Sequence, residues 1–590
     1  MPPTAQEELH RLVHGPCDPA FLTELHKALA TDDPQLLHRL GALGATLPPA
    51  DRLFEDPARL TALHAWTAVT DPSLCLAALV HHLLCLGSMA RLGDGSTHLA
   101  GRMEALRSGR AKGVYLITEA GRANSHLATR TVAELDPESG EFVLHTPDPG
   151  AAKFGSAGTL DVPQTAVVLA RLVTDGTDRG VFGFVVDLSG AEGLLPGIEV
   201  SSPLGLGALP LDYVQVRFDH VRVPYGQWLA DGAARESDGT FHDPAGSPER
   251  RLERTLRVGQ GLWATMPAVA AATARQSAVQ AVDYARGRPT QARLSPGAPL
   301  LSYRTQQRAV LGALADAFAL TCAAHGARRV WEESLAGRAQ PPGTGTAMGF
   351  TPWAAVSRPL AAYKAVTVRL AAQLIAECRR RCGFSGHLDA NRLAAYGGFH
   401  DAFDTAGGDS QLILYDIGRA LADEAREADG PEAPVTALPS PLAPGWWTAV
   451  VRRHEATLAR ELAHRSRATG DRTPFEVWNP LLEDAGLLGE VHATALLAGD
   501  TVRALDAVQD QSLAEALRPL AALHGVVAAR RLAGSLLAHG TLRPADVREL
   551  PGAADELCDA LLPRLPLLTE AFAFPKDLAA DPTWTRGGTA

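Results

Sequence analysis

The run YVQVRFDHVRVP, residues 213–224, alternates apolar and polar side chains along most of its length. Such alternation is typical of a β-strand with one buried face. Five more runs rich in β-branched residues precede it, separated by clusters of Gly, Pro, Asp and Ser. They are VYLITEAG, TRTVAELD, EFVLHTP, TAVVLARLV and VFGFVVDL. Strands this closely spaced leave no room for helices between them, so residues 113–246 are predicted to form a β-barrel or β-sandwich domain.

Helical periodicity dominates on both sides of this segment. Residues 1–112 read as short helices broken at HGPCDP, LGATLPPADR and VTDPS. Residues 247–428 hold three or four long amphipathic stretches with few breakers, which favour an antiparallel bundle. A linker with five prolines, ADGPEAPVTALPSPLAPG, precedes a second helical bundle at 445–590. The predicted fold class is therefore α+β, mainly α, with four domains.

Composition excludes several classes of partner. The chain has 590 residues and a net charge of −11, which argues against nucleic acid or an anionic membrane surface. The seven cysteines are scattered without a C-x-x-C pair, so neither a metal site nor a disulfide framework is predicted. We find no secretory signal, no peroxisomal ending and no apolar run approaching about 18 residues without charge. A cytoplasmic protein without a membrane span is the expectation.

The segment FDTAGGDSQLIL, residues 403–414, is unusual between two amphipathic helices. It holds the adjacent glycines Gly407 and Gly408 and one carboxylate, Asp409. Each glycine costs a helix roughly 1 kcal/mol relative to alanine. The segment must therefore need backbone freedom or empty space.

The combination of these features resembles the acyl-CoA dehydrogenase and oxidase flavoproteins. The resemblance rests on the helical, β, helical order, on ITEAG in the first strand and on HTPDPGAAKF after a hairpin. It continues through LGLGALPLDYVQVRFDHVRVP and YARGRPTQARLSPGAPLLSYRTQQRAVL. The TQQ run, the second helical bundle and the ending LLPRLPLLTEAFAFPKDLAADP are similar to the acyl-CoA oxidase branch. The resemblance covers essentially the whole chain.

This resemblance implies an FAD site in a cleft between the β-domain and the first bundle. The T-E-x-G segment, with Thr118 and Gly121, would meet the polar edge of the flavin. Gly155 and Ser156 correspond to a second flavin-contacting segment, and hydroxyls of Thr118 and Ser156 would donate toward the flavin, which stabilises its reduced ring. An ordinary strand threonine is the alternative interpretation of Thr118.

The resemblance also implies a homodimer. Arg288 matches an arginine that reaches the FAD diphosphate of a neighbouring subunit, so the cofactor sites would straddle the dimer interface. CGFSGH matches the family's C-G-G-x-G-Y/F, where Gly383 and Gly386 would let the backbone approach the adenosine. Phe384 and His387 replace the family's glycine and aromatic residue, so that contact is altered. TAGGDS matches the T-x-E-G-[DE]-N loop, which places Gly408 among the cofactor-binding residues.

The same alignment places Gly407 where most acyl-CoA oxidases carry the glutamate that removes the substrate's α-proton. Hydride transfer from a thioester needs such a base. A carboxylate elsewhere would then supply it, and LERTLRVGQG matches the E-R-x-x-x-x-G pattern of the isovaleryl- and long-chain-type dehydrogenases. Glu253 is accordingly the candidate base, with a solvent-facing glutamate on a charged helix as the alternative. Asp409 is the second candidate base.

Two further hypotheses stay open. The chemistry could do without this base, as in oxidative decarboxylation or oxygenation, with the space at Gly407 and Gly408 admitting a bulky α-substituent. The chain could instead be an inactive homologue that serves as a structural partner. The leading hypothesis is FAD-dependent α,β-dehydrogenation of an acyl thioester, carried by CoA or a carrier protein. O2 is the expected electron acceptor, and bacterial secondary metabolism is the suggested setting.

Overall fold

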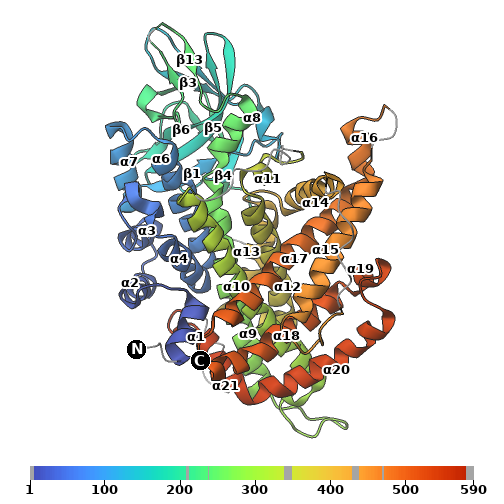
Figure 1. The fold of residues 1–590 in the computed structure, drawn as a ribbon. Coiled ribbons are helices and arrows are strands. Elements are labelled where there is room, and N and C mark those ends of the chain that lie inside the picture. Colours follow the sequence, from blue (N-terminus) through green and yellow to red (C-terminus); the bar gives the residue numbers. More distant parts are fainter. Residues whose placement is uncertain are drawn as a thin grey trace.

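The computed structural model of the protein describes residues 5–206, 211–236, 238–337, 349–427, 437–467 and 471–579. A β-domain sits at one end of the molecule, flanked by the N-terminal helices, and two helical bundles fill the remainder (Figure 1). This arrangement confirms the predicted fold class. Part of the glycine-bearing 204–224 segment, residues 207–210, and part of the proline-rich linker, residues 428–436, lie outside the described residues.

The N-terminal region is built of short helices, several of which begin with proline after an Asp N-cap. Asp71, for example, accepts hydrogen bonds from the backbone N–H groups of Ser73 and Leu74, which satisfies the start of the next helix. That helix continues into a π-helical segment, η2 (Leu79–Leu86), which packs on the first strand. The α-helices are α1 (Ala5–His14), α2 (Pro19–Leu29), α3 (Leu36–Ala45), α4 (Pro57–Thr70), α5 (Pro72–Ala78), α6 (Gly87–Leu92) and α7 (Thr97–Arg107).

The β-domain contains an eight-stranded sheet, a three-stranded sheet of order β4-β9-β8 and a small hairpin. Its longest strands are joined by an Asp175–Gly176 turn in which both residues have positive φ, as a tight hairpin requires. The strands are β1 (Lys112–Leu116), β2 (Val132–Leu135), β3 (Phe142–His145), β4 (Lys153–Ser156), β5 (Gln164–Thr174), β6 (Thr177–Gly190), β7 (Gly193–Leu194), β8 (Ile198–Val200), β9 (Tyr213–Phe218), β10 (Val221–Val223), β11 (Trp228–Leu229), β12 (Ala234–Arg235) and β13 (Phe241–His242).

The run at 213–224 forms two strands rather than one. The chain turns at Asp219 and His220, and His220 has φ +53. As a result β9 pairs with β4 and β8 in the small sheet, whereas β10 pairs with β3 in the large sheet. The single sequence run thus links the two sheets, and the strand β4 was not predicted.

The first bundle is dominated by three long helices that pack against one another. In α9 nearly every residue is buried, because the helix packs against α4 of the N-terminal region and against α10 and α12 of the first bundle. α9 ends at Gly287, two residues before Pro289. The residue that precedes a proline is disfavoured in the helical conformation, so a helix end at this point is expected. The helices are α8 (Pro248–Leu256), α9 (Gly259–Gly287), α10 (Arg304–Leu335), α11 (Pro352–Val356), α12 (Arg358–Arg381), α13 (Leu393–Thr405) and α14 (Ser410–Glu427).

The C-terminal bundle packs along the first one, chiefly through α17 on α10, α12 and α14. The last helix, α21, returns to contact α1 and α9, so the two ends of the chain lie close together (Figure 1). The helices are α15 (Trp446–Arg465), α16 (Pro474–Trp478), α17 (Leu482–Ala507), α18 (Gln511–Arg531), α19 (Ala533–Ala538), α20 (Pro544–Leu561) and α21 (Leu565–Phe572).

Two helical stretches in the described residues are long and apolar enough to cross a membrane, Pro72–Leu92 and Arg304–Leu335. The expectation that no such run exists was therefore wrong for Pro72–Leu92, which the sequence search missed. In the folded chain 72% and 83% of these two windows are buried against protein. Core helices pass the same composition test, so the two stretches are weak evidence for a membrane span.

Candidate active site

The Gly407–Gly408 loop follows α13 directly, and both glycines are in the left-handed region, with φ +65 and +91. A Cβ atom at Gly407 would lie 2.8 Å from Leu262 Cδ2, and one at Gly408 would lie 3.2 Å from Trp353 Cγ. Leu262 and Trp353 therefore border the Cβ positions of the two glycines closely. The glycines are required by backbone conformation and close packing.

Hydrogen bonds to both backbone carbonyls fix this loop. Trp263 Nε1 donates to the Gly407 carbonyl at 2.8 Å, and Lys364 Nζ donates to the Gly408 carbonyl at 2.6 Å. Lys364 is fully buried and also donates to Ser410 Oγ at 3.1 Å and to the Asp404 carbonyl at 3.4 Å. Burial lowers the Lys364 pKa to about 7. Its three oxygen acceptors make Lys364 an anchor beneath the loop.

Asp409 serves the next helix. Its Oδ1 accepts hydrogen bonds from the backbone N–H groups of Gln411 at 2.9 Å and Leu412 at 3.2 Å. This is the position and geometry of a helix N-cap at the start of α14. The second candidate base therefore has a structural role in this loop.

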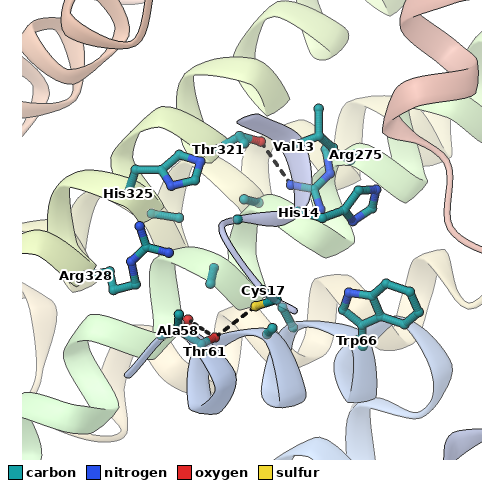
Figure 2. A pocket seen from close by; sticks show the side chains of 16 residues that line it. Val13, His14, Cys17, Ala58, Thr61, Trp66, Arg275, Thr321, His325 and Arg328 are labelled. Carbon is teal, nitrogen blue, oxygen red and sulfur yellow. Dashed lines mark hydrogen bonds between the residues drawn. The ribbon is translucent and has the colours of Figure 1, made fainter. Parts of the chain in front are cut away.

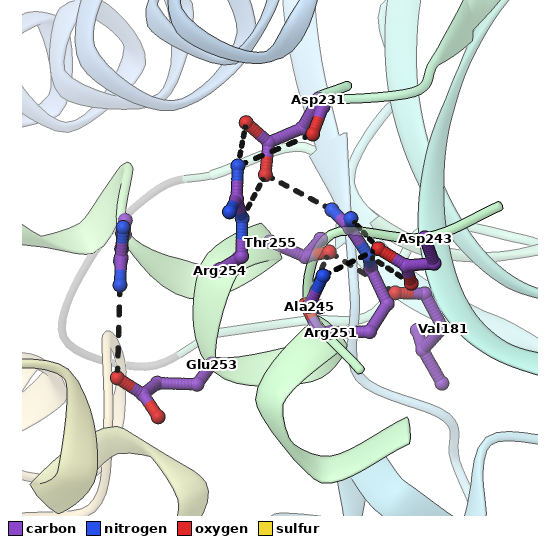
Figure 3. Close-up of polar contacts among 9 residues, drawn as sticks. Val181, Asp231, Asp243, Ala245, Arg251, Glu253, Arg254 and Thr255 are labelled. Atoms are coloured by element: carbon purple, nitrogen blue, oxygen red, sulfur yellow. Dashed lines mark hydrogen bonds and ion pairs between the residues drawn. The ribbon is translucent and has the colours of Figure 1, made fainter. Parts of the chain in front are cut away.

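Glu253 lies on α8 and is half-buried. Figure 3 shows its side chain directed away from the side of α8 that carries Arg251 and Arg254. Its nearest basic partner is Arg257, with 4.0 Å between Nη2 and Oε1. Burial raises the pKa of Glu253, and the charges of Arg257 and Arg250 oppose that rise only in part.

Two basic residues of α8, Arg251 and Arg254, anchor the helix to the β-domain. Arg251 is fully buried and pairs with Asp231 at 2.9 Å and with Asp243, while Arg254 pairs with Asp231 at 2.6 Å (Figure 3). Thr255 Oγ1 also donates to the Val181 carbonyl in the β-domain, at 3.0 Å. These contacts hold α8 against the β-domain; Glu253 points away from Arg251 and Arg254, and α8 also packs on α11.

Trp353 on α11 connects the β-domain to the glycine loop. Its ring lies 5.9 Å from that of His126 and 5.4 Å from that of Trp263. A Cβ atom at Gly259 would lie 2.6 Å from Trp353 Cζ3. The indole Nε1 is buried without a hydrogen-bond acceptor among the described residues. No pattern in the sequence marked Trp353, because a single tryptophan after Thr-Pro carries no motif.

The T-E-x-G segment is tied to β4. The Thr118 carbonyl accepts a hydrogen bond from Phe154 N at 3.0 Å, and Gly121 N donates to the Gly150 carbonyl at 2.8 Å. Thr118 is half-buried, and none of the hydrogen bonds found among the described residues involves its hydroxyl. Glu119 pairs with Lys153 at 3.2 Å. Burial raises the pKa of Glu119, but the Lys153 charge and the backbone N–H donors lower it by more, so the pKa is lowered overall.

Gly155 and Ser156 face protein groups. A Cβ atom at Gly155 would lie 2.7 Å from Leu116 Cδ2. The Ser156 hydroxyl donates to the Asp212 carboxylate and accepts from Lys112 Nζ at 3.4 Å. Of the two hydroxyls expected to face a flavin, that of Ser156 is therefore already engaged and that of Thr118 is the available one.

Arg288, Gly383 and Gly386 lie together at the far end of α9. Arg288 is exposed and follows the last turn of the helix, with its N–H donating to the Tyr284 carbonyl. Gly383 has φ +59, and a Cβ atom there would meet only the Tyr284 hydroxyl, at 3.6 Å. A Cβ atom at Gly386 would lie 2.2 Å from the Arg379 carbonyl, so that position requires glycine. By helix rise, Gly259 and Gly287 are roughly 40 Å apart, so one chain does not bring these residues to the Gly407 loop.

Among the described residues, three potential metal ligands gather at the turn between β9 and β10, namely His145, Asp219 and His220. Asp219 and His220 are exposed. This turn lies in the β-domain and involves none of the residues described above.

Comparison with known proteins agrees with this arrangement. The family description "Acyl-CoA oxidase, C-alpha1 domain" matches residues 262–422, and the description "Acyl-CoA oxidase" matches residues 445–578, together half of the chain. Peroxisomal acyl-coenzyme A oxidase 1 of Arabidopsis thaliana is 29% identical over 337 residues, covering 55% of this chain and 48% of its own. The bovine peroxisomal acyl-coenzyme A oxidase 1 is 25% identical and covers 78% and 73%. The chain spans about half the length of several curated relatives that it matches.

Solved structures show the same fold over nearly the whole chain. Acyl-CoA oxidase 1 from Yarrowia lipolytica has a TM-score of 0.82 at 20% identity, covering 98% of this chain and 89% of its own. Acyl-CoA oxidase-1 of Caenorhabditis elegans, solved with FAD and ATP, has a TM-score of 0.77 at 19% identity and covers 97% and 89%. With both oxidase domains matched in order and the glycine loop between α13 and α14, the chain belongs to the acyl-CoA oxidase family.

Proposed function

We propose that the protein is an FAD-dependent oxidoreductase that introduces an α,β double bond into an acyl thioester, with Glu253 as the base. One observation carries the proposal. Position 407 has no carboxylate, whereas Glu253 is a half-buried carboxylate of raised pKa on a helix that packs on α11. A general base that removes the α-proton of a thioester works best when its pKa lies near the working pH, so a raised carboxylate pKa favours this role.

In the proposed reaction, Glu253 accepts the α-proton on a carboxylate oxygen. Bound FAD supplies the acceptor for the hydride that leaves the β-carbon. The buried N–H of Trp353 has no acceptor within the described residues, so it is available to a group bound at this site. Lys364 and Trp263 hold the loop that borders this space.

The residues fit an FAD site in two respects. The half-buried Thr118 has an available hydroxyl at the end of β1, and the orphaned indole N–H of Trp353 lies beside His126 of the β-domain. A bound group with acceptor oxygens would satisfy that donor, whose burial without a partner costs about 1–3 kcal/mol. Thr118 and Gly121 would hold the flavin edge, and Arg288, Gly383 and Gly386 would hold the adenosine diphosphate half.

A homodimer is part of the proposal. The two sets of cofactor residues lie at opposite ends of α9, so a second copy must bring one set to the other. Near the Arg288 end, Leu294 is 90% exposed and Phe384 is 84% exposed, the largest exposures of apolar side chains in the described chain. In the proposed dimer the second copy would cover these two side chains. Light scattering should give a dimer, and Phe384→Ser should weaken both the dimer and FAD retention.

Three finer points extend the proposal. O2 is the acceptor for the reduced flavin, because the matched family is that of the oxidases. The acyl group is carried by CoA or by a carrier protein in the cytoplasm, in a pathway of bacterial secondary metabolism. A base-independent reaction on an α-substituted substrate is the alternative, and Leu262 and Trp353 close to the two glycines limit the bulk of that substituent.

Anaerobic mixing of the FAD-loaded protein with acyl thioesters tests the proposal. We expect short, branched or aromatic acyl-CoA or acyl-pantetheine thioesters to bleach the flavin absorbance without release of CO2. Release of CO2 with bleaching would replace dehydrogenation by a decarboxylative reaction. A protein that cannot be loaded with FAD would refute the proposal and favour a structural partner.

A further inference from the structure

A small cavity lies far from the glycine loop, where α1, α4, α9 and α10 meet. Its volume is about 40 Å³, and its walls include His14, Arg275, His325 and Arg328 (Figure 2). A cavity of this size holds one to three water molecules or one small ion. It is too small for a nucleotide or an acyl chain.

Arg275 on α9 is a buried cation without a counter-charge. Its side chain is 4% exposed, and Nη1 donates to Thr321 Oγ1 at 3.1 Å. Nε has no acceptor, and within the described residues no carboxylate lies within ion-pairing distance of its guanidinium. Burial lowers the Arg275 pKa to about 9. An uncompensated buried charge is strongly unfavourable in a protein interior.

A second guanidinium borders the same cavity. Within the described residues Arg328 pairs with one carboxylate, Glu332, at 3.2 Å, and the Glu332 side chain is 42% exposed. Gly15 has φ +84, and a Cβ atom added there would lie 3.4 Å from Arg328 Nη1. The chain after α1 therefore closes over this side of the cavity. Two positive groups therefore share at most one half-exposed carboxylate.

The two histidines of the cavity, His14 and His325, do not change its net charge. Burial lowers the pKa of His14, and the neighbouring Arg275 lowers it further. Burial likewise lowers the pKa of His325 to about 4, with smaller contributions from Arg328 and Arg275, while its Nε2 lies 2.7 Å from the Leu12 carbonyl. Both imidazoles are neutral near pH 7, so the cavity has a net positive wall.

We propose that this cavity binds a small inorganic monoanion of chloride size, held between Arg275 and Arg328. The anion neutralises Arg275 and fixes both ends of the chain, because α1 and the segment after α21 pack around the same arginine. Phe574 lies 5.3 Å below the Arg275 guanidinium, and the rings of His14 and Phe574 lie 5.4 Å apart. The site is independent of the proposed oxidation chemistry.

Thermal unfolding of the full chain in sodium chloride, bromide or gluconate at matched ionic strength tests this proposal. We expect the melting temperature to rise with chloride or bromide concentration and to stay lower in gluconate, whose anion is too large for the cavity. Arg275→Gln should weaken the apparent halide affinity at least tenfold. The control Arg548→Gln, at an exposed position on α20, should leave the halide response unchanged.

An equal response to chloride and gluconate would overturn the proposal, as would a halide response that survives Arg275→Gln. If Arg275→Gln fails to fold, a crystal of the unaltered protein grown with bromide decides the matter by anomalous scattering. A bromide peak between Arg275 and Arg328 supports the site. An empty or water-filled cavity under those conditions refutes it.

Discussion

Replacing Gly407 by alanine tests whether the loop is closely packed or has empty space. An L-residue at φ +65 costs about 1–2 kcal/mol. The new Cβ atom would lie 2.8 Å from Leu262 Cδ2, and Leu262 is only 2% exposed, so repacking costs about 1 kcal/mol more. The expected destabilisation of Gly407→Ala is therefore about 2–3 kcal/mol. Restoring a glutamate at this position would meet the same penalty.

Melting temperature measured by calorimetry is the assay, with Gly534→Ala as the matched control. Gly534 lies in helix α19 with no atom within 4 Å of its Cβ position, so alanine there should be neutral or slightly stabilising. The double variant Gly407→Ala/Leu262→Ala should be less destabilised than the two single changes added together, because Leu262→Ala removes the clash. A Gly407→Ala shift no larger than that of Gly534→Ala would refute the reasoning.

Changes at Lys364, at Asp409 and in pH also have defined outcomes. Lys364→Met should cost about 1–3 kcal/mol, since the buried Gly408 carbonyl loses its donor; an unchanged melting temperature would contradict the role of Lys364 as an anchor. Asp409→Asn should leave stability and flavin reduction nearly unchanged, because asparagine also caps helices, while Asp409→Ala should cost about 1 kcal/mol of stability. Burial lowers the pKa of His64 to about 3, of His81 to about 4 and of His400 to about 3. Only the unfolded chain gains protons there below about pH 6.5, so stability should fall as pH drops from 6.5 toward 4, and His400→Gln should flatten that fall.

Local sequence signals were sufficient for the order of the helical and β regions. Alternation marked the β-domain, and long uninterrupted periodicity marked α9, α10 and α12. The split of the 213–224 run into β9 and β10 depends on one residue with positive φ, His220, which alternation does not reveal. Apolar composition likewise left Pro72–Leu92 ambiguous, because burial against other helices is decided by tertiary packing.

The candidate site was predictable only where it follows a motif. The pattern around Glu253 located the carboxylate, but its orientation follows from Arg251 and Arg254 reaching Asp231 and Asp243. The hydrogen bond from the Ser156 hydroxyl to Asp212 joins residues 56 positions apart in the chain, so no local pattern predicts it. Trp353 carries no sequence signal, since its role depends on contacts with the loop and the β-domain.

The rate of flavin reduction in a single anaerobic turnover tests most directly the claim that Glu253 replaces the missing loop glutamate. We expect Glu253→Gln to slow this step by roughly 10²–10⁴-fold. Stability should hardly change, because the nearest basic partner, Arg257, is 4.0 Å away and such a pair contributes at most about 1 kcal/mol. A rate in Glu253→Gln equal to that of the unaltered protein would contradict the claim.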